Sequence, residues 1–201
     1  MSDFPIALHG ERVTAVIVGG GSVGTRKAMA LADAGARVDV IAPVATPDLE
    51  EADRQRKITL VREEYRADHL DGATLVIAAT DAREVNARIA VDAQSKGKLV
   101  NITDYPDEGN FHSMALHRSG DITIAVSSGG VPGAAARIRD AIAERFDSRY
   151  GRALSALRGL RSRLIATGEE RWQAAAPQLV GEDFCSSVED GSIAHKVDAW
   201  R

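Results

Sequence analysis

The sequence predicts an α/β fold: an N-terminal parallel sheet, then a small α+β segment, then a helical C-terminal region. Strand-like apolar runs alternate with helical stretches through the first half of the chain, which is typical of a parallel sheet covered by crossover helices. The first run breaks into a glycine-rich turn and continues as a helix. The second half carries one further strand signal and is otherwise helical in pattern.

The glycine-rich turn indicates a Rossmann-type crossover. Residues 13–18 fit a buried strand, and Gly19, Gly21 and Gly24 follow it in the order G-x-G-x-x-G. In such a turn Gly19 permits the tight bend, Gly21 lets the backbone approach a pyrophosphate, and Gly24 lets the helix pack close to the strand. The helix N-terminus directs its free N–H groups at the anion. Doubly wound folds without a dinucleotide also contain such turns, so the motif alone leaves the ligand open.

The remaining elements of the first half follow from the same alternation. We expect strands at residues 12–19, 37–42, 58–63, 75–79 and 99–103, and helices at residues 23–34, 46–56 and 84–96. Gly35 and Gly97 come directly after two of these helices, where a left-handed C-terminal residue favours glycine. Five strands with crossover helices complete a Rossmann-type sheet near Asp104.

A different pattern begins after this sheet. Residues 105–111 contain Pro106 and Gly109 and break the periodicity, which predicts a connection and a domain boundary. A strand is expected at residues 121–126, a turn at 127–130, a helix at 132–146 that begins at Pro132, and a second helix at 149–166. Beyond residue 174 the periodicity weakens and several glycines occur, so the helices expected there have no clear bounds.

Composition excludes several classes of function. The chain has 201 residues, 44% of them hydrophobic, and a net charge of -4, so it can bury a core and has no global basic field for nucleic acid or anionic lipid. Cys185 is the single cysteine, which excludes an internal disulfide. The five histidines have no metal-ligand spacing, so we expect no fixed metal site. Without a membrane-spanning run or a signal-peptide pattern, the expected location is the cytoplasm.

The end of the second strand bears on the choice of dinucleotide. Rossmann dehydrogenases often bind the ribose with an acidic residue about 20 residues after the glycine turn, and this chain has Pro43 and Val44 there. Asp39 lies inside the expected strand and Asp48 in the next helix. Because there is no arginine at this position to bind the 2′-phosphate of NADP, the pattern favours NAD, although NADP stays possible.

Polar residues follow the fourth and fifth strands, whose carboxyl ends meet at the ligand-binding edge of a parallel sheet. They include Thr80 and Asp81 after one strand and Asp104 after the other. A carboxylate there can take or give a proton, so Asp104 is the candidate acid-base residue. The structural alternatives are that Asp104 caps the turn before Pro106 and that Asp81 is the N-cap of the following helix.

A second group of candidates lies beyond the boundary. Residues 127–130, Ser-Ser-Gly-Gly, can form an anion-binding nest of backbone N–H groups or an ordinary turn. Nearby Arg118, Arg137 and Arg139 would suit a substrate with carboxylates, because a guanidinium group binds them bidentately. His112 and His117 could reach the cleft or be isolated surface residues.

Several short motifs occur together in one order. They are the glycine turn with Arg26-Lys27, Ala-Ala-Thr-Asp with Asn86, Val-Asn-Ile-Thr-Asp ending at Asp104, Phe111, Gly120-Asp121, and Ala-Val-Ser-Ser-Gly-Gly at residues 125–130. This set, spanning about residues 4–139, resembles the precorrin-2 dehydrogenase and sirohydrochlorin ferrochelatase family, the N-terminal module of siroheme synthase.

The resemblance implies an organisation and a reaction. It implies an NAD-binding Rossmann domain at residues 1–110, a dimerisation and substrate-cleft segment at 111–147 and a helical C-terminal domain at 148–201, assembled as a homodimer. The implied reaction is oxidation of precorrin-2, a tetrapyrrole, to sirohydrochlorin with NAD+, followed in some members by Fe2+ insertion. No long extension that could house a methyltransferase is present, so we do not expect the chain to make precorrin-2.

The resemblance also assigns roles to individual residues. Asp104 falls on the family's catalytic aspartate, and Ser128 on a serine near the tetrapyrrole. Cofactor-contacting positions match Ser22 and Val23, as well as Pro43 and Val44.

The chain departs from the family pattern at two places beside the expected cleft. Where many members of the family read Gly-Gly-x-Ser-Pro, residues 129–133 read Gly-Gly-Val-Pro-Gly, which shifts the proline by one position and removes a hydroxyl group. The family's Phe-x-x-Pro-Ala segment reads Phe-His-Ser-Met-Ala at residues 111–115, without the proline. His112 could substitute as a substrate ligand. The alternatives to a dehydrogenase are an enzyme that only chelates metal and an NAD-sensing module.

Overall fold

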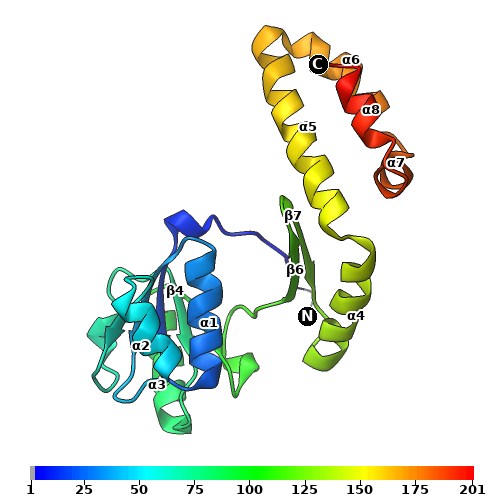
Figure 1. Ribbon diagram of the computed structural model, residues 1–201. Helices are drawn as coiled ribbons and strands as arrows, with labels where there is room; N and C mark the ends of the chain where they lie inside the picture. The colour runs from blue at the N-terminus through cyan, green and yellow to red at the C-terminus, as the bar shows by residue number, and fades with distance from the viewer. Residues whose placement is uncertain (1–2) are drawn as a thin grey trace. The chain divides into compact units, whose positions relative to one another are not determined.

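The computed structural model describes residues 3–201, which divide into two units, one up to Ser113 and one from Met114 to Arg201 (Figure 1). The first unit is the expected α/β sheet. Its strands are β1 (Thr14–Val18), β2 (Arg37–Ile41), β3 (Thr59–Val61), β4 (Leu75–Ala78) and β5 (Leu99–Ile102). They are all parallel, in the order β3-β2-β1-β4-β5.

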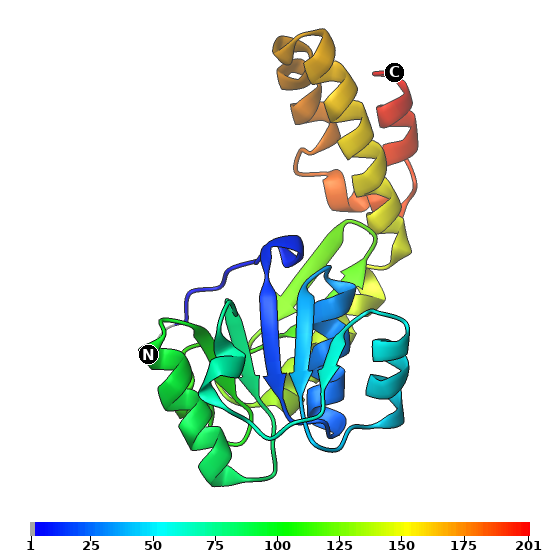
Figure 2. The ribbon, with the colours of Figure 1, turned by 90° about the vertical axis from the view of Figure 1, so that its left-hand side faces the viewer.

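Helices cover both faces of this sheet, as Figure 2 shows. The helices are α1 (Ser22–Asp33), α2 (Pro47–Arg54) and α3 (Arg83–Ser95), with short 3-10 turns η1 (Gly10–Arg12), η2 (Ala67–Leu70) and η3 (Pro106–Glu108). Alternate strand residues serve opposite faces: Ile17 packs with α1 and α2, and Val16 packs with α3. The central strands are apolar on both sides because both sides are buried.

Glycines end two of these helices as the sequence predicts. Gly35 and Gly97 follow α1 and α3 with φ of 86° and 65°, a left-handed conformation that glycine adopts without steric cost. The five strands and three helices of the first half are therefore confirmed, with ends that differ by a few residues from those expected.

The second unit begins with a two-stranded antiparallel sheet, β6 (Ala115–Ser119) and β7 (Ile122–Val126), which α4 (Pro132–Arg145) covers. Strand β6 was not predicted. Its half-buried side chains are Ala115, His117 and Ser119, so the face that points inward has no apolar alternation to reveal it. Strand β7 has Ile122 and Ile124 at those positions and was predicted.

The rest of the second unit is helical. It contains α5 (Ser148–Thr167), α6 (Glu169–Leu179), α7 (Phe184–Glu189) and α8 (Ile193–Asp198). Leucines of α5, such as Leu160, pack with Leu179 of α6 and Val197 of α8 to form a separate core. The sequence predicted α5 and a helical C-terminal region, which is confirmed, but it gave no bounds for α6, α7 and α8. The division into domains at residues 110 and 147 stays a prediction. No helix within residues 3–201 is long and apolar enough to cross a membrane.

Candidate functional site

The strand order of the first unit creates a site between β1 and β4. The chain leaves β1 toward β2 on one side and later returns to β4 on the other, so the crossovers diverge at this point of the sheet. In open parallel sheets, ligands bind outside the carboxyl ends of the strands at this position. The glycine turn follows β1, and Thr80 and Asp81 follow β4, so the sequence candidates meet at this edge.

Close backbone packing explains two glycines of the turn. Gly19 has φ of 122°, and a Cβ there would lie 2.2 Å from the carbonyl oxygen of Ala79. A Cβ on Gly24 would lie 2.0 Å from the carbonyl oxygen of Gly19. Real Cβ atoms do not approach oxygen so closely, so these glycines let α1 and the β4 connection press against the turn.

Gly21 is different and provides the test of cofactor fit. It is the N-cap of α1, its φ is -79°, and a Cβ added there would have nothing within 4 Å. Neither backbone conformation nor protein packing requires glycine at this position. The first N–H groups of α1 are unpaired within the helix and lie next to this open space. Lack of a side chain at Gly21 thus leaves room for an anionic ligand, as a pyrophosphate requires.

Hydroxyl groups fix the turn to the loop after β2. Thr25 Oγ1 donates to the Gly21 carbonyl at 2.9 Å and forms a second hydrogen bond with Thr46 Oγ1 at 2.7 Å, in which Thr46 can be the donor. Thr46 Oγ1 also accepts from the Leu49 N–H as the N-cap of α2. The N–H of Thr46 donates to the Gly20 carbonyl at 3.0 Å. These bonds hold the start of α1 and the start of α2 as one rigid edge.

The candidates after β2 and in α1 are accessible from solvent. Pro43 and Ser22 are exposed, Val44 is 80% exposed, and Val23 is 37% exposed. Asp39 is within β2 and Asp48 within α2, as expected. The edge after β2 therefore presents apolar side chains and backbone groups, with neither an acidic ribose ligand nor an arginine.

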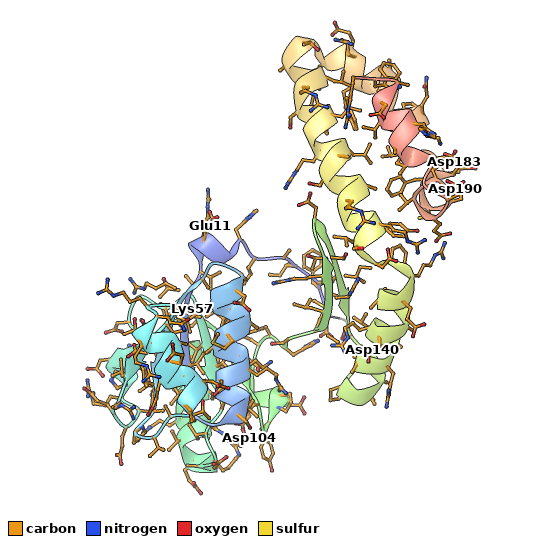
Figure 3. The ribbon with its side chains drawn as sticks, viewed as in Figure 1. Glu11, Lys57, Asp104, Asp140, Asp183 and Asp190 are labelled. Carbon is orange, nitrogen blue, oxygen red and sulfur yellow. The ribbon has the colours of Figure 1, made fainter. Side chains whose placement is uncertain are left out.

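A buried amide links the ends of β4 and β5. Asn86 of α3 donates from Nδ2 to Asp104 Oδ1 at 3.0 Å and to the Thr80 carbonyl at 3.0 Å. Its Oδ1 accepts from Thr80 Oγ1 at 2.7 Å. Asp104 is exposed, and Figure 3 shows it at the lower edge of the first unit. The structure thus joins Thr80 and Asp104, two sequence candidates, through one residue to which the sequence assigned no role.

The capping roles considered for the two aspartates are not found. The N-cap of α3 is Ala82, without a side-chain hydrogen bond, so Asp81 does not cap it. The N-cap of η3 is Tyr105, again without such a bond, and Asp104 bonds to Asn86 instead. Asp104 thus bonds to a residue distant in sequence and does not form the hydrogen bond to a neighbouring backbone N–H that aspartate often makes in turns.

A charged cluster stands beside Asp104. Arg83 of α3 forms an ion pair with Glu108 of η3 and stacks over the Tyr105 ring at 4.2 Å from its centroid. The hydrogen bond from Glu108 raises the pKa of Arg83, and the charge of Asp104 adds to that effect. Sequence analysis did not select these residues, since nothing in their spacing brings residue 83 next to residue 108.

The last residues of the first unit make two more polar contacts. Lys27 Nζ donates to Ser113 Oγ at 2.7 Å, and burial, with the charge of Arg26, lowers the pKa of Lys27. His112 is exposed, with Nε2 3.6 Å from Asp3 Oδ2. These contacts tie residues 112–113 to the N-terminal part of the unit.

Three substrate candidates belong to the second unit. Ser128 Oγ donates to the Val131 carbonyl and closes the turn before α4, and Gly129 and Gly130 in that turn have φ of 59° and 94°. Arg118 on β6 and Arg137 on α4 are exposed. Within residues 3–201 no group of three or more His, Cys, Asp or Glu side chains could hold a metal ion.

Comparison with known proteins places these features in a family. The family model described as "Putative NAD(P)-binding" matches residues 6–115, which include the whole glycine turn and Asp104. The siroheme synthase of Chromobacterium violaceum is 37% identical over 153 residues, which is 76% of this chain and 33% of that protein. The siroheme synthase of Methylobacillus flagellatus is 31% identical over 199 residues, 96% of this chain and 43% of that protein.

A solved structure has the same fold throughout. "SirC, precorrin-2 dehydrogenase" superposes with a TM-score of 0.81 and 19% identity, covering 98% of this chain and 100% of that one. The chain spans about a third to two fifths of the length of the siroheme synthases above. Since the family match covers more than half of the chain and includes the dinucleotide turn, the protein belongs to this family of NAD(P)-binding proteins.

Proposed function

We propose that the protein oxidises precorrin-2 to sirohydrochlorin with NAD+, as a step of siroheme synthesis. The observation that carries the proposal is the position of Asp104. It is an exposed carboxylate beside the dinucleotide edge, with one oxygen bonded to Asn86 and the other without a hydrogen-bond partner among the described residues. The names of the similar proteins supply the substrate class.

In this oxidation the substrate loses two hydrogens, one as hydride and one as a proton. NAD+, when bound, accepts one of them as hydride with the bonding electron pair. The other leaves as a proton, which Asp104 Oδ2 would accept. The N-terminus of α1 and Gly21 would hold the pyrophosphate, with Ser22, Val23 and Gly24 providing backbone groups. Pro43, Val44, Thr80 and Asp81 would line the rest of the cofactor edge.

The lack of a basic residue after β2 supports NAD over NADP. A 2′-phosphate would need a cation at Pro43 or Val44, and neither can supply one.

The other substrate contacts are part of the proposal. Arg118, Arg137, Ser128 and His112 would bind the acetate and propionate groups of the tetrapyrrole, since guanidinium and hydroxyl groups pair well with carboxylates.

Fe2+ insertion is proposed as a second activity of the same carboxylate. The entry of a metal releases protons from two pyrrole nitrogens, and Asp104, which is exposed to solvent, can accept them one after the other by passing the first to water before it takes the second. A cytoplasmic location and a homodimer complete the proposal. Leu116, Val131 and Ile138 in the expected dimerisation segment are 43%, 57% and 48% exposed, which supports an interface there.

The test is an anaerobic assay with enzymatically generated precorrin-2 and NAD+ that follows NADH and sirohydrochlorin, with Fe2+ added last. We expect Asp104→Ala to lower the rate of NADH formation at least about 100-fold, the usual contribution of a positioned acid-base group. Asp107→Ala, an exposed aspartate of η3, is the matched control and should keep the wild-type rate.

Four outcomes would contradict parts of the proposal. Full activity of Asp104→Ala would remove Asp104 from the reaction. Siroheme formation from sirohydrochlorin without any NADH would favour a chelatase, and NAD binding without either product would favour a sensor. Unchanged metal insertion by His112→Ala would exclude His112 as a ligand.

A further inference from the structure

Asn86 is a fully buried polar side chain at the proposed site. It is the fourth residue of α3, with 0% of its surface exposed. Its amide can form four hydrogen bonds, two as donor and two as acceptor. Each has a partner: Oδ1 accepts from the Thr80 N–H at 3.3 Å and from Thr80 Oγ1 at 2.7 Å, whose hydrogen also faces the Ala82 carbonyl at 3.1 Å, and Nδ2 donates to the Thr80 carbonyl and to Asp104.

The backbone of Thr80 fixes which way the amide faces. An N–H can only donate and a carbonyl can only accept, so Asn86 must turn Oδ1 to the Thr80 N–H and Nδ2 to the Thr80 carbonyl. The second hydrogen of Nδ2 then points at Asp104 Oδ1, 3.0 Å away. Asn86 is therefore a hydrogen-bond donor to Asp104 and cannot take a proton from it.

We propose that Asn86 is a positioning residue for the acid-base carboxylate. Its amide holds Oδ1 of Asp104 in place and leaves Oδ2 for the proton of the substrate. Because Asn86 also binds both backbone groups of Thr80, it sets the distance between the carboxylate after β5 and the cofactor edge after β4. This inference rests on the proposed function, since that function gives Asp104 its task.

The other charged groups near Asp104 form no hydrogen bond with it among the described residues. Arg83 is on the same helix as Asn86, and its positive charge also acts on Asp104, but Glu108 of η3 is its ion-pair partner. Tyr105, the neighbour of Asp104 in sequence, stacks under Arg83. The hydrogen bond from Asn86 is the one direct side-chain contact of Asp104 among the described residues, so its removal should change the carboxylate most.

Asn86→Asp is the sharpest substitution, because it keeps the shape and the acceptor and replaces only the donor. We expect the acid limb of the pH profile of kcat to move up by about one pH unit, since a hydrogen bond to the ionised form is lost and a like charge is added. Asn110→Asp is the matched control. Asn110 binds only the backbone of Lys98 and Val100 at the opposite end of β5, so its pH profile should stay that of the wild type.

A titration of the Asp104 carboxyl carbon by NMR tests the same contact without catalysis. The full chain is used, and Asp104→Asn assigns the signal. The midpoint should rise by about one pH unit in Asn86→Asp and stay unchanged in Asn110→Asp. Should Asn86→Asp not fold, Asn86→Ser replaces it. The shorter serine hydroxyl has one hydrogen and cannot serve both Thr80 and Asp104, so the same direction of change is expected.

The outcomes separate the two proposals. An unchanged Asp104 midpoint, or lower activity with an unmoved pH profile, would make Asn86 a structural residue and overturn the inference. A wild-type protein that forms no NADH from precorrin-2 would overturn the proposed function. In that case the NMR midpoint still decides whether Asn86 holds the carboxylate.

Discussion

The two glycine turns of this protein look alike in sequence and differ in construction. One precedes α1 and the other precedes α4. In the first, a Cβ on Gly19 or Gly24 would collide with backbone oxygen at 2.2 Å and 2.0 Å. In the second, Gly129 and Gly130 have positive φ, but a Cβ on either would have nothing within 4 Å.

The difference separates two uses of glycine. In the first turn, glycine lets a strand, a turn and a helix pack together, so the dinucleotide edge is built as one rigid body. In the second, glycine supplies only the left-handed backbone that other residues adopt at a cost. A rigid edge suits the binding of a cofactor in one geometry. An open turn tolerates substitution.

The largest expected effect is that of Gly24→Ala. Alanine favours helices over glycine by about 1 kcal/mol, yet here its Cβ would overlap the Gly19 carbonyl, so we expect the free energy of unfolding to fall by about 3 kcal/mol. Urea unfolding measures it. Gly133→Ala in α4, where a Cβ meets nothing within 4 Å, is the control and should not destabilise. An equal loss of unfolding free energy in Gly24→Ala and Gly133→Ala would show that close packing is not what requires glycine at residue 24.

Gly21→Ala should affect binding without affecting folding. Because the added Cβ enters open space, the free energy of unfolding should stay within about 0.5 kcal/mol of the wild type. The methyl group would occupy the space left for the pyrophosphate, so the Kd for NAD+ should rise about tenfold, equivalent to about 1.4 kcal/mol. Calorimetric titration gives the Kd. An unchanged affinity would mean that the cofactor does not approach this turn.

Gly130→Ala tests the second turn, where only the backbone conformation requires glycine. With φ of 94° and no crowding, the cost is only that of placing a side chain in a left-handed conformation, about 1 kcal/mol. The Kd for NAD+ should be that of the wild type. A loss as large as that of Gly24→Ala would show that the second turn is as constrained as the first.

The smallest effect concerns a buried tyrosine in the second unit. Tyr150 donates to Glu189 at 3.0 Å, and burial followed by hydrogen bonding raises its pKa to about 12. The folded protein holds this proton more tightly than the unfolded chain does. The stabilisation that Tyr150 contributes is therefore fully present below about pH 10 and is lost as the pH rises toward 12. Tyr150→Phe should cost about 1 kcal/mol at pH 7 and remove this alkaline slope. An unchanged slope would assign it to other groups.

The first unit has a comparable tyrosine, Tyr65, which can also contribute to the fall in stability at alkaline pH. Tyr65 donates to Asp92 at 2.8 Å, and burial raises its pKa as well. Near-ultraviolet circular dichroism of Tyr65→Phe and Tyr150→Phe as the pH is raised separates the two contributions.

The sequence predicted most of the first unit because its signals are local. A strand buried on both faces, such as β1, reads as a continuous apolar run, and Gly35 and Gly97 mark helix ends by a backbone preference that needs no partner. The end of β5 and the family's motifs also indicate Asp104, which stays a predicted site residue. For the second unit, the local signal of β7 was sufficient, whereas β6 is recognisable only by its pairing with β7.

Tertiary structure decided what depends on residues far apart in the chain. The bond between Asn86 and Asp104 spans 18 positions and the ion pair of Arg83 with Glu108 spans 25, and neither follows from spacing. Gly151 of α5 shows the same limit: a Cβ there would lie 2.4 Å from the Ser119 carbonyl, which the helical pattern around it does not reveal. Sequence determines backbone preference and burial pattern, since these act within a few residues. Which polar groups meet depends on the packing of whole elements.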